Sequence, residues 1–284
     1  MTLPDVLAGI TLVALTGYVL LGGADFGGGV WDLLASGPRR TRQRELIERA
    51  IGPVWEANHV WLILAVVLLF TCFPPAFARL AIALHIPLTL VLIGIVLRGS
   101  AFAFRSYGSE RQVERYWGRA FAVASLVTPV LLGVSVGAVA SGAVGEWGIG
   151  RGFYESYVAP WLTPFAFAVG LFALACFALL AAVYLTLEAP ARDWDLQEDF
   201  RRRALAAGIG VLGAAALAWV LALPAEGARA GAPFVVAAAG AAGTTFTALW
   251  WRRYRIARVA AAAQVALIVW GWGLAQYPYL VPPD

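Results

Sequence analysis

The stretch from Ile51 to Pro75, IGPVWEANHVWLILAVVLLFTCFPP, joins a polar cluster to an apolar run. Its second half contains no charged residue, whereas Glu56, Asn58 and His59 stand together in its first half. A helix that crosses a bilayer needs about 20 mainly apolar residues. A carboxylate in or at the edge of such a helix is costly, which makes it a candidate for a functional group. The stretch therefore predicts a membrane-spanning helix that carries a polar site.

The composition places the whole chain in a membrane. Hydrophobic residues make up 61% of the 284 residues and charged residues 13%, and the mean hydropathy is +0.76. A soluble domain holds about 45–50% apolar and about 25% charged residues. No segment between the apolar runs is long enough for a soluble module, so we expect one integral membrane domain over residues 1–284. The basic residues, all Arg, cluster in loops between apolar runs, and no nucleic-acid partner is expected.

Eight apolar runs predict the fold class, an all-α bundle of about eight transmembrane helices in the lipid bilayer. The expected spans are residues 6–25, 55–73, 78–97, 120–140, 161–187, 204–223, 233–250 and 259–277. Two GxxxG pairs, Gly23 with Gly27 and Gly133 with Gly137, predict close contacts between helices.

The arginines between the spans predict the orientation. Of the 21, 18 lie in the segments that follow spans one, three, five and seven. Cytoplasmic loops of membrane proteins collect Arg and Lys. We therefore expect a multi-pass protein with its amino terminus outside the cell and with the arginine-rich segments in the cytoplasm.

This orientation brings two acids to the same side of the membrane. Span one runs inward and is expected to end at Asp25, while span two starts at Trp55 and runs outward. Asp25 and Glu56 are therefore expected to be neighbours at the cytoplasmic end. Pro53 suits the first turn of a helix, and the helix macrodipole would then stabilise the Glu56 anion.

The two acids and the polar residues near them are of the types that form the entrance of a proton path. His59 lies three residues after Glu56, within reach on a helix surface, and Asn58 adds an amide. The competing interpretation is that Glu56 only caps its helix and that the glycines around Asp25 only let two helices touch. Arg98, at the end of span three, either pairs with one of the acids or extends to the interface. A paired Arg98 would orient a carboxylate and carry no proton.

Haem or metal ligation by this chain is not expected. His59 lies four residues into span two and His85 seven residues into span three from the opposite side. At about 1.5 Å per residue, their depths differ by more than about 10 Å across a core of about 30 Å. One iron cannot take both as axial ligands, and the only Met is the first residue. His85 is interpreted as a packing residue or as one that faces a partner subunit.

Five segments of the chain are similar to a known family. GGADFGGG at residues 22–29, IGPVWEANHVWLI at 51–63, FPPAFA at 73–78, LRGSAFAFRS at 97–106 and the terminal YPYLVPPD resemble subunit II of the cytochrome bd-type quinol oxidases. The most specific part is a core of Pro53, Trp55, Glu56, Asn58, Trp61 and Leu62, with the Gly-x-Asp-x-Gly element around Asp25. The resemblance runs nearly from end to end.

The resemblance implies a fold, a partner and a reaction. Members of the family consist of two four-helix bundles and a ninth, peripheral helix, for which this sequence has no further apolar run. They pair in the bacterial plasma membrane with subunit I, which ligates haem b and haem d and oxidises quinol near the outer face. A small single-helix subunit can accompany the pair, and some relatives hold a structural quinone. This chain would then hold no haem, support subunit I and deliver cytoplasmic protons for the reduction of oxygen to water.

The expected site is a proton path without a catalytic group of its own. The path residues are Asp25, Glu56, Asn58 and His59, and the supporting residues are Trp55, Trp61 and Arg98. Ala103 stands where relatives commonly carry an acid, which removes one carboxylate from such a path. Two other functions remain open: a proton-coupled membrane transporter that uses the same acids, and a purely structural partner.

Overall fold

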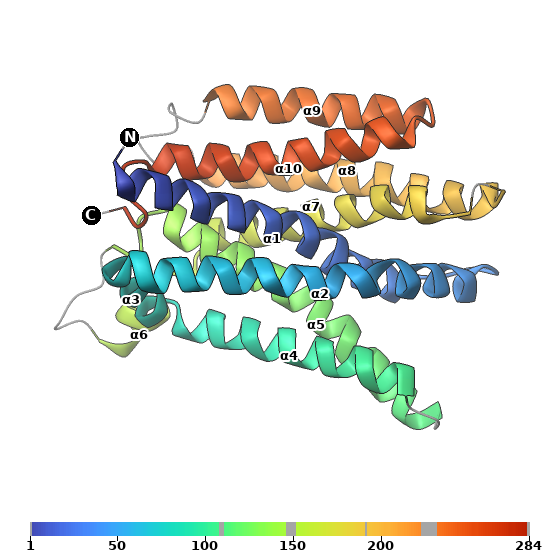
Figure 1. Cartoon of the computed structure of the whole chain (residues 1–284), viewed down its shortest axis with the longest axis horizontal. Helices are drawn as coiled ribbons and strands as arrows, with labels where there is room; N and C mark the ends of the chain where they lie inside the picture. Colours follow the sequence, from blue (N-terminus) through green and yellow to red (C-terminus); the bar gives the residue numbers. More distant parts are fainter. Residues whose placement is uncertain (1, 108–110, 146–151, 191, 223–231, 283–284) are drawn as a thin grey trace.

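The computed structural model describes residues 2–107, 111–145, 152–190, 192–222 and 232–282, which form helices joined by turns, with no strand in these ranges (Figure 1). The helices are α1 (Leu3–Leu33), α2 (Arg40–Cys72), α3 (Pro74–Ala83), α4 (His85–Tyr107), α5 (Arg111–Ala140), α6 (Phe153–Tyr157), α7 (Pro164–Glu188), α8 (Trp194–Ala222), α9 (Ala232–Trp250) and α10 (Tyr254–Gln276). Seven of them are long and apolar enough to cross a membrane, and the bent pair of α3 and α4 makes an eighth if it is one span. The predicted all-α membrane bundle is confirmed.

The long helices form two groups of four, as the family resemblance implies. The first group contains α1, α2, α4 and α5, and the second contains α7, α8, α9 and α10, while contacts of α1 and α5 with α7 join the groups. The apolar spans of α5 and α7 are 67% and 61% buried, whereas that of α2 is 11% buried. Helices α5 and α7 therefore lie at the centre, and α2 turns most of its apolar surface outward.

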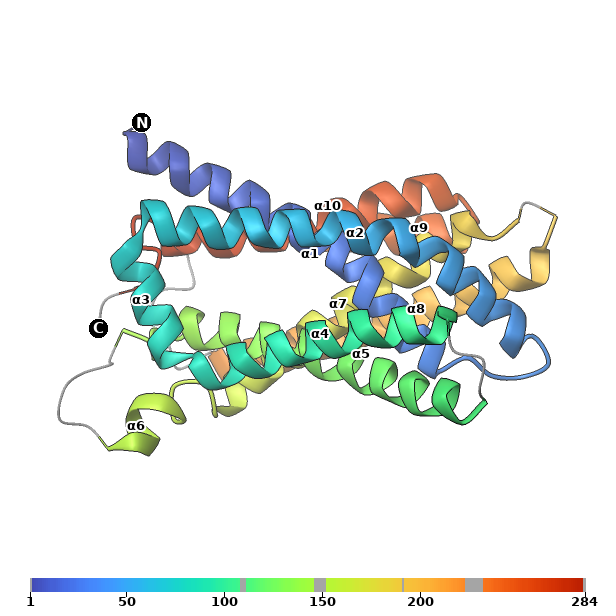
Figure 2. The same ribbon diagram turned by 60° about the horizontal axis from the view of Figure 1, so that its bottom comes forward.

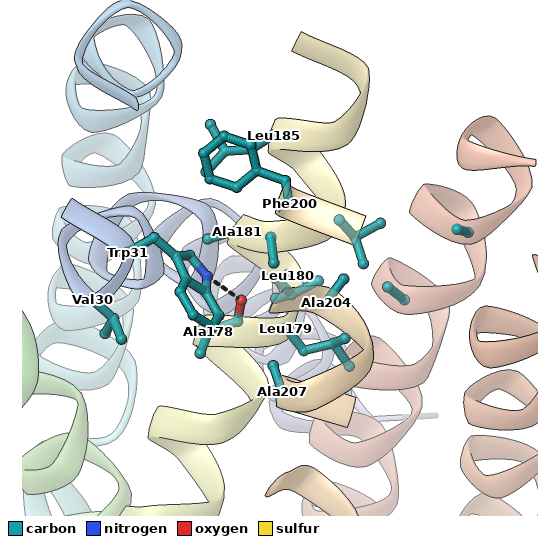
Figure 3. Packing of buried hydrophobic residues seen from close by; sticks show 14 of the residues in the cluster. Val30, Trp31, Ala178, Leu179, Leu180, Ala181, Leu185, Phe200, Ala204 and Ala207 are labelled. Atoms are coloured by element: carbon teal, nitrogen blue, oxygen red, sulfur yellow. Dashed lines mark hydrogen bonds between the residues drawn. The ribbon is translucent and has the colours of Figure 1, made fainter. Parts of the chain in front are cut away.

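Small residues let the central helices approach to backbone contact. A Cβ atom added at Gly27 of α1 would lie 2.0 Å from the carbonyl oxygen of Phe177 in α7, and one at Gly133 of α5 would lie 2.7 Å from the backbone of α7. The close contacts predicted from the GxxxG spacing are confirmed. Nearby, Trp31 Nε1 donates a 2.8 Å hydrogen bond to the Ala178 carbonyl oxygen, which Figure 3 shows among the surrounding core side chains.

The third predicted span, residues 78–97, is wrong as a single helix. The chain breaks at Leu84, and α3 meets α4 at 85°, so that α3 turns away from the direction of α4 (Figure 2). Pro87 explains the break, because a proline ring clashes with the carbonyl group four residues earlier, here that of Ala83. His85 consequently starts α4 in an exposed position, and its ring packs edge-on against an aromatic ring of α6 with centroids 5.0 Å apart.

The first two helices are longer than predicted. Helix α1 does not end at Asp25 but continues to Leu33, and α2 begins at Arg40 and not at Trp55. Pro53 therefore lies inside α2, and the expected stabilisation of the nearby carboxylate by a helix start is wrong. The reason is physical, because an apolar run marks the part of a helix that lies in hydrocarbon, whereas the polar turns beyond it are equally helical.

Polar contacts tie the two groups of helices together at the end where α1 gives way to α2. Arg39 donates hydrogen bonds of 2.8 and 2.6 Å to the carboxylate of Asp199 in α8, and Gln43 donates one of 2.8 Å to the same group. This pairing raises the pKa of Arg39. Arg203 of α8 donates to Gln43 at 2.7 Å and lies over the ring of Trp31 at 5.6 Å. The loop between α1 and α2 is thereby held against the second group.

Replacing Gly27 by Ala is expected to lower the free energy of unfolding by about 1–3 kcal/mol, the usual cost of overpacking. The added methyl group would meet a backbone oxygen, which cannot rotate away as a side chain can. Gly9→Ala is the matched control on the same helix, because a Cβ there has nothing within 4 Å. Thermal unfolding of the purified protein would measure both variants, and equal midpoints would contradict the proposed packing role.

Candidate functional site

A buried ion pair lies inside the first group of helices. Asp25 of α1 is 1% exposed and Arg98 of α4 is 2% exposed, and an Nη atom of Arg98 contacts Asp25 Oδ2. Arg98 also donates hydrogen bonds to the Asp25 carbonyl oxygen at 2.5 Å and to Ser125 Oγ of α5 at 3.0 Å. The rings of Phe26 and Phe121 lie 4.6 and 5.0 Å from its guanidinium carbon. Of the alternatives open for Arg98, pairing with Asp25 is the one that the structure shows.

A small cavity adjoins this ion pair. The space open to the centre of a water molecule is about 10 Å³, close to the minimum that one water needs. Its polar lining comes from three helices and consists of Tyr18, Asp25, Trp55, Asn58, His59 and Arg98. Apolar side chains of Phe26, Leu62 and Ile95 complete the wall. Three of the four residues expected in the proton path therefore meet at one cavity.

Helical spacing explains which side chains reach the cavity. Tyr18 and Asp25 of α1 are seven residues apart, about two turns, and so share one face. Trp55 and Asn58 of α2 are three residues apart and also share a face. Gly22 brings the helices together here, because a Cβ at this position would lie 3.3 Å from Asn58 Nδ2.

Glu56 occupies different surroundings from Asp25. It is exposed on α2, it is absent from the cavity wall, and it forms no ion pair with any described residue. Two residues correspond to about 200° around a helix, so Glu56 and Asn58 cannot share a face. The expectation that Glu56 and Asp25 share one site is therefore wrong. Asp25 lines the cavity, whereas Glu56 faces outward.

His59 lies between these two surroundings. It is half-buried, it lines the cavity, and it stands three residues after Glu56 on the same helix. Its Nδ1 donates a 2.8 Å hydrogen bond to the Trp55 carbonyl oxygen, because that oxygen can only accept. A neutral imidazole with this tautomer keeps Nε2 as an acceptor. His59 therefore has one nitrogen that can take up a proton.

The two tryptophans expected to support the site pack between helices. A Cβ added at Gly17 of α1 would lie 2.6 Å from an indole carbon of Trp61, and one at Gly99 of α4 would lie 3.1 Å from the indole of Trp55. Trp61 thus presses α2 against α1, and Trp55 reaches across to α4. Both rings set the spacing of the helices that bear the polar residues.

Sequence reasoning missed Tyr18 and Ser125. Tyr18 is 5% exposed and lines the cavity, and Ser125 is fully buried and accepts from Arg98. The signal for Tyr18 was a hydroxyl group in an apolar span, two turns before Asp25. No local signal marks Ser125, because its contact joins helices that only the fold brings together. The side chain of Ala103 lies outside the described residues, so the consequence of the missing acid stays a prediction.

Metal ligands do not gather in the part of the chain that the structure describes, where no three His, Cys, Asp or Glu side chains are placed to hold an ion. His59 stands 13 residues before Cys72, the end of α2, which is about 20 Å along the helix. His85 starts α4 near that end. The two histidines therefore lie too far apart in depth to serve as the axial ligands of one haem.

Comparison with known sequences decides the family. The family model described as cytochrome bd terminal oxidase subunit II matches residues 3–284. The chain belongs to this family.

Two curated proteins illustrate how the subunit II family is related to this chain. Cytochrome bd ubiquinol oxidase subunit 2 of Bacillus subtilis is 31% identical over 125 residues, which are 44% of this chain and 36% of the relative. Cytochrome bd-I ubiquinol oxidase subunit 2 of Escherichia coli K12 is 28% identical over 178 residues, which are 62% of this chain and 46% of the relative. The matched stretches thus span less than half the length of either relative.

A solved structure has the same fold. The bd oxidase from Geobacillus thermodenitrificans contains a chain that is 23% identical to this one, with a TM-score of 0.80, and the match covers 100% of this chain and 87% of that chain. At this level of identity the likeness shows the fold alone. The arrangement of the membrane helices is therefore that of a bd oxidase chain.

Replacing Arg98 by Met is expected to lower the free energy of unfolding by about 3–5 kcal/mol, because it leaves the buried carboxylate of Asp25 without a counter-charge. Adding Asp25→Asn to this variant should recover part of the loss, since the stranded charge is removed as well. Unfolding of the wild type, the two single variants and the double variant gives the coupling energy. Losses that simply add would show that the two side chains do not interact.

Proposed function

We propose that this chain is the haem-free subunit II of a quinol:oxygen oxidoreductase of the cytochrome bd type. In this function it supports a haem-bearing subunit I in the bacterial plasma membrane, with its own amino terminus outside, and it delivers cytoplasmic protons toward the site of oxygen reduction. Haem b and haem d would be held by the partner, and quinol would be the substrate of the complex. Family membership supports the reaction class.

The observation that carries the proton role is the position of His59 between exposed Glu56 and the cavity at Asp25. Reduction of oxygen to water takes up a proton for each electron, so the complex needs a supply of protons. Glu56 and His59 are one helical turn apart and can both change protonation state. Arg98 pairs with Asp25, which makes this carboxylate an orienting group for the proton on His59.

The outward face of α2 supports the presence of a protein partner. Glu56 is exposed there among apolar side chains, of which Val60, Ile63 and Phe70 are 64%, 61% and 60% exposed. A carboxylate that faces lipid hydrocarbon is costly, so a protein surface is the more favourable neighbour. We assign this face to subunit I. An accessory single-helix subunit rests on the family resemblance alone.

The depths of the two histidines support a chain that ligates no haem. His59 and His85 differ in depth by about 20 Å, so they cannot be the two axial ligands of one iron. Haem, when bound by the partner, would supply the redox chemistry, and this chain would supply support and protons.

The transporter alternative gains no support from the cavity. A proton-coupled carrier needs a solute site beside its titratable groups, whereas the space at Asp25 admits about one water molecule. The oxidase function is therefore the one that the geometry favours.

Glu56→Gln is expected to slow quinol-dependent oxygen consumption of the assembled complex at least about 100-fold, the lower end of what a positioned proton-transferring group contributes. Glu48→Gln is the matched control, because Glu48 is also an exposed acid of α2 and lies two turns nearer the start of the helix. Haem content per complex reports assembly. An unchanged rate in Glu56→Gln with full haem content would refute the proton path through this residue.

An affinity tag on this chain is expected to recover a haem-bearing subunit from membranes in mild detergent. The absorption spectrum of the purified material should show haem d together with haem b. Transport of a solute by the isolated chain, in the absence of any haem subunit, would instead establish the carrier function.

A further inference from the structure

Polar atoms without a protein partner converge on the cavity beside the ion pair. Tyr18 Oη, Asp25 Oδ1 and Asn58 Oδ1 have no hydrogen-bond partner among the described residues, and all three residues line the cavity. The residues are 5%, 1% and 2% exposed, respectively. Buried polar groups in proteins are nearly always hydrogen-bonded, to protein or to ordered water. The cavity therefore has the character of a binding site for a ligand that serves all three.

The number and kind of these groups match one water molecule. An ionised carboxylate and an amide oxygen only accept hydrogen bonds, whereas a phenol group can donate. Water has two protons to donate, one each for Asp25 and Asn58, and it can accept from Tyr18. The space of about 10 Å³ open to a water centre suits about one molecule.

A metal cation is a poorer occupant, although the oxygens alone would suit one. Arg98 lines the same cavity and already balances the charge of Asp25. A further positive charge would be repelled by the guanidinium group at short range. A neutral ligand that donates two hydrogen bonds is therefore the one that fits.

We propose that the cavity holds one ordered water, which donates to Asp25 Oδ1 and Asn58 Oδ1 and accepts from Tyr18 Oη. Tyr18 is then a positioning residue for the proton on His59. This second part rests on the proposed function, whereas the water site itself does not.

The role of Tyr18 follows from the coordination of the water. With two hydrogen bonds donated and one accepted, the water can still accept one more. A protonated His59, which lines the same cavity, can donate from Nε2 to this position. The imidazolium would thus be linked through the water to the anion of Asp25. Loss of the Tyr18 hydroxyl group frees the water to turn, and the proton on His59 is held less well.

The water site is tested by electron cryo-microscopy of the assembled complex at a resolution that shows ordered waters in buried positions. The wild type is expected to show one density between Tyr18, Asp25 and Asn58. Asn58→Leu, which keeps a similar volume but offers no acceptor, is expected to lose it. A wild-type map without this density, alongside clear density for other buried waters, would overturn the proposal. Density with the short contacts of a metal ion would overturn it as well.

The positioning role is tested by Tyr18→Phe, which removes one oxygen atom. The charged and titratable groups that line the water site are Asp25 and Tyr18 of α1, His59 of α2 and Arg98 of α4. Glu56 lies outside the cavity, one helical turn from His59. Oxygen consumption is expected to fall about threefold to tenfold, as the loss of one hydrogen bond gives. The alkaline limb of its pH profile should move to lower pH, because His59 loses its proton more readily.

Tyr184→Phe is the control for Tyr18→Phe, since Tyr184 is a half-buried tyrosine of α7 in the second group of helices. It should leave the rate and the pH profile unchanged. If Tyr18→Phe also leaves both unchanged at full haem content, the positioning role is refuted even where the water density is present. Failure of the proposed proton path would show separately, as an unaltered rate in Glu56→Gln.

Discussion

The buried contact between Asp25 and Arg98 constrains how the first group of helices is arranged. Burial of two charges costs several kcal/mol per ion, which their attraction and added hydrogen bonds only repay when the geometry is good. Arg98 contacts the Asp25 carboxylate and donates hydrogen bonds to the Asp25 carbonyl group and to Ser125, whereas Asp25 Oδ1 has no hydrogen-bond partner among the described residues. The pair therefore adds little net stability but fixes how α1, α4 and α5 are rotated relative to one another.

The rotation of these helices separates the buried ion pair from His59 and Glu56, the two groups proposed to carry protons. Asp25 stays next to a guanidinium group that does not titrate, so the pair presents a constant field to the cavity. His59 and Glu56 lie outside this pair and can change protonation state. The proposed proton path would thus combine an exposed acid, a half-buried imidazole and a carboxylate that is paired with an arginine, each made different by its surroundings.

The site is packed tightly on the side of α7 and α8, whereas α2 on its other side is mostly exposed. Backbone contact at Gly27 and the bond from Trp31 to Ala178 hold α1 firmly against α7, and Arg39 with Asp199 ties the loop before α2 to α8. In contrast, little of the apolar span of α2 is buried. The first group of helices is therefore supported from the second group, and the α2 face that carries Glu56 is left uncovered by the described residues.

The sequence by itself determined the membrane class, the all-α fold and the polar stretch around Glu56, because these depend on composition and on local apolar runs. It also determined the family, through motifs that lie within single segments. The ends of α1 and α2 were not determined, since apolar runs mark hydrocarbon and not the length of a helix. The choice of Asp25 as the partner of Arg98, the inward position of Asn58 and the outward position of Glu56 were decided only by the tertiary structure. The physical reason is that packing against neighbouring helices sets the rotation of each helix about its axis. The local sequence of one helix does not determine this rotation.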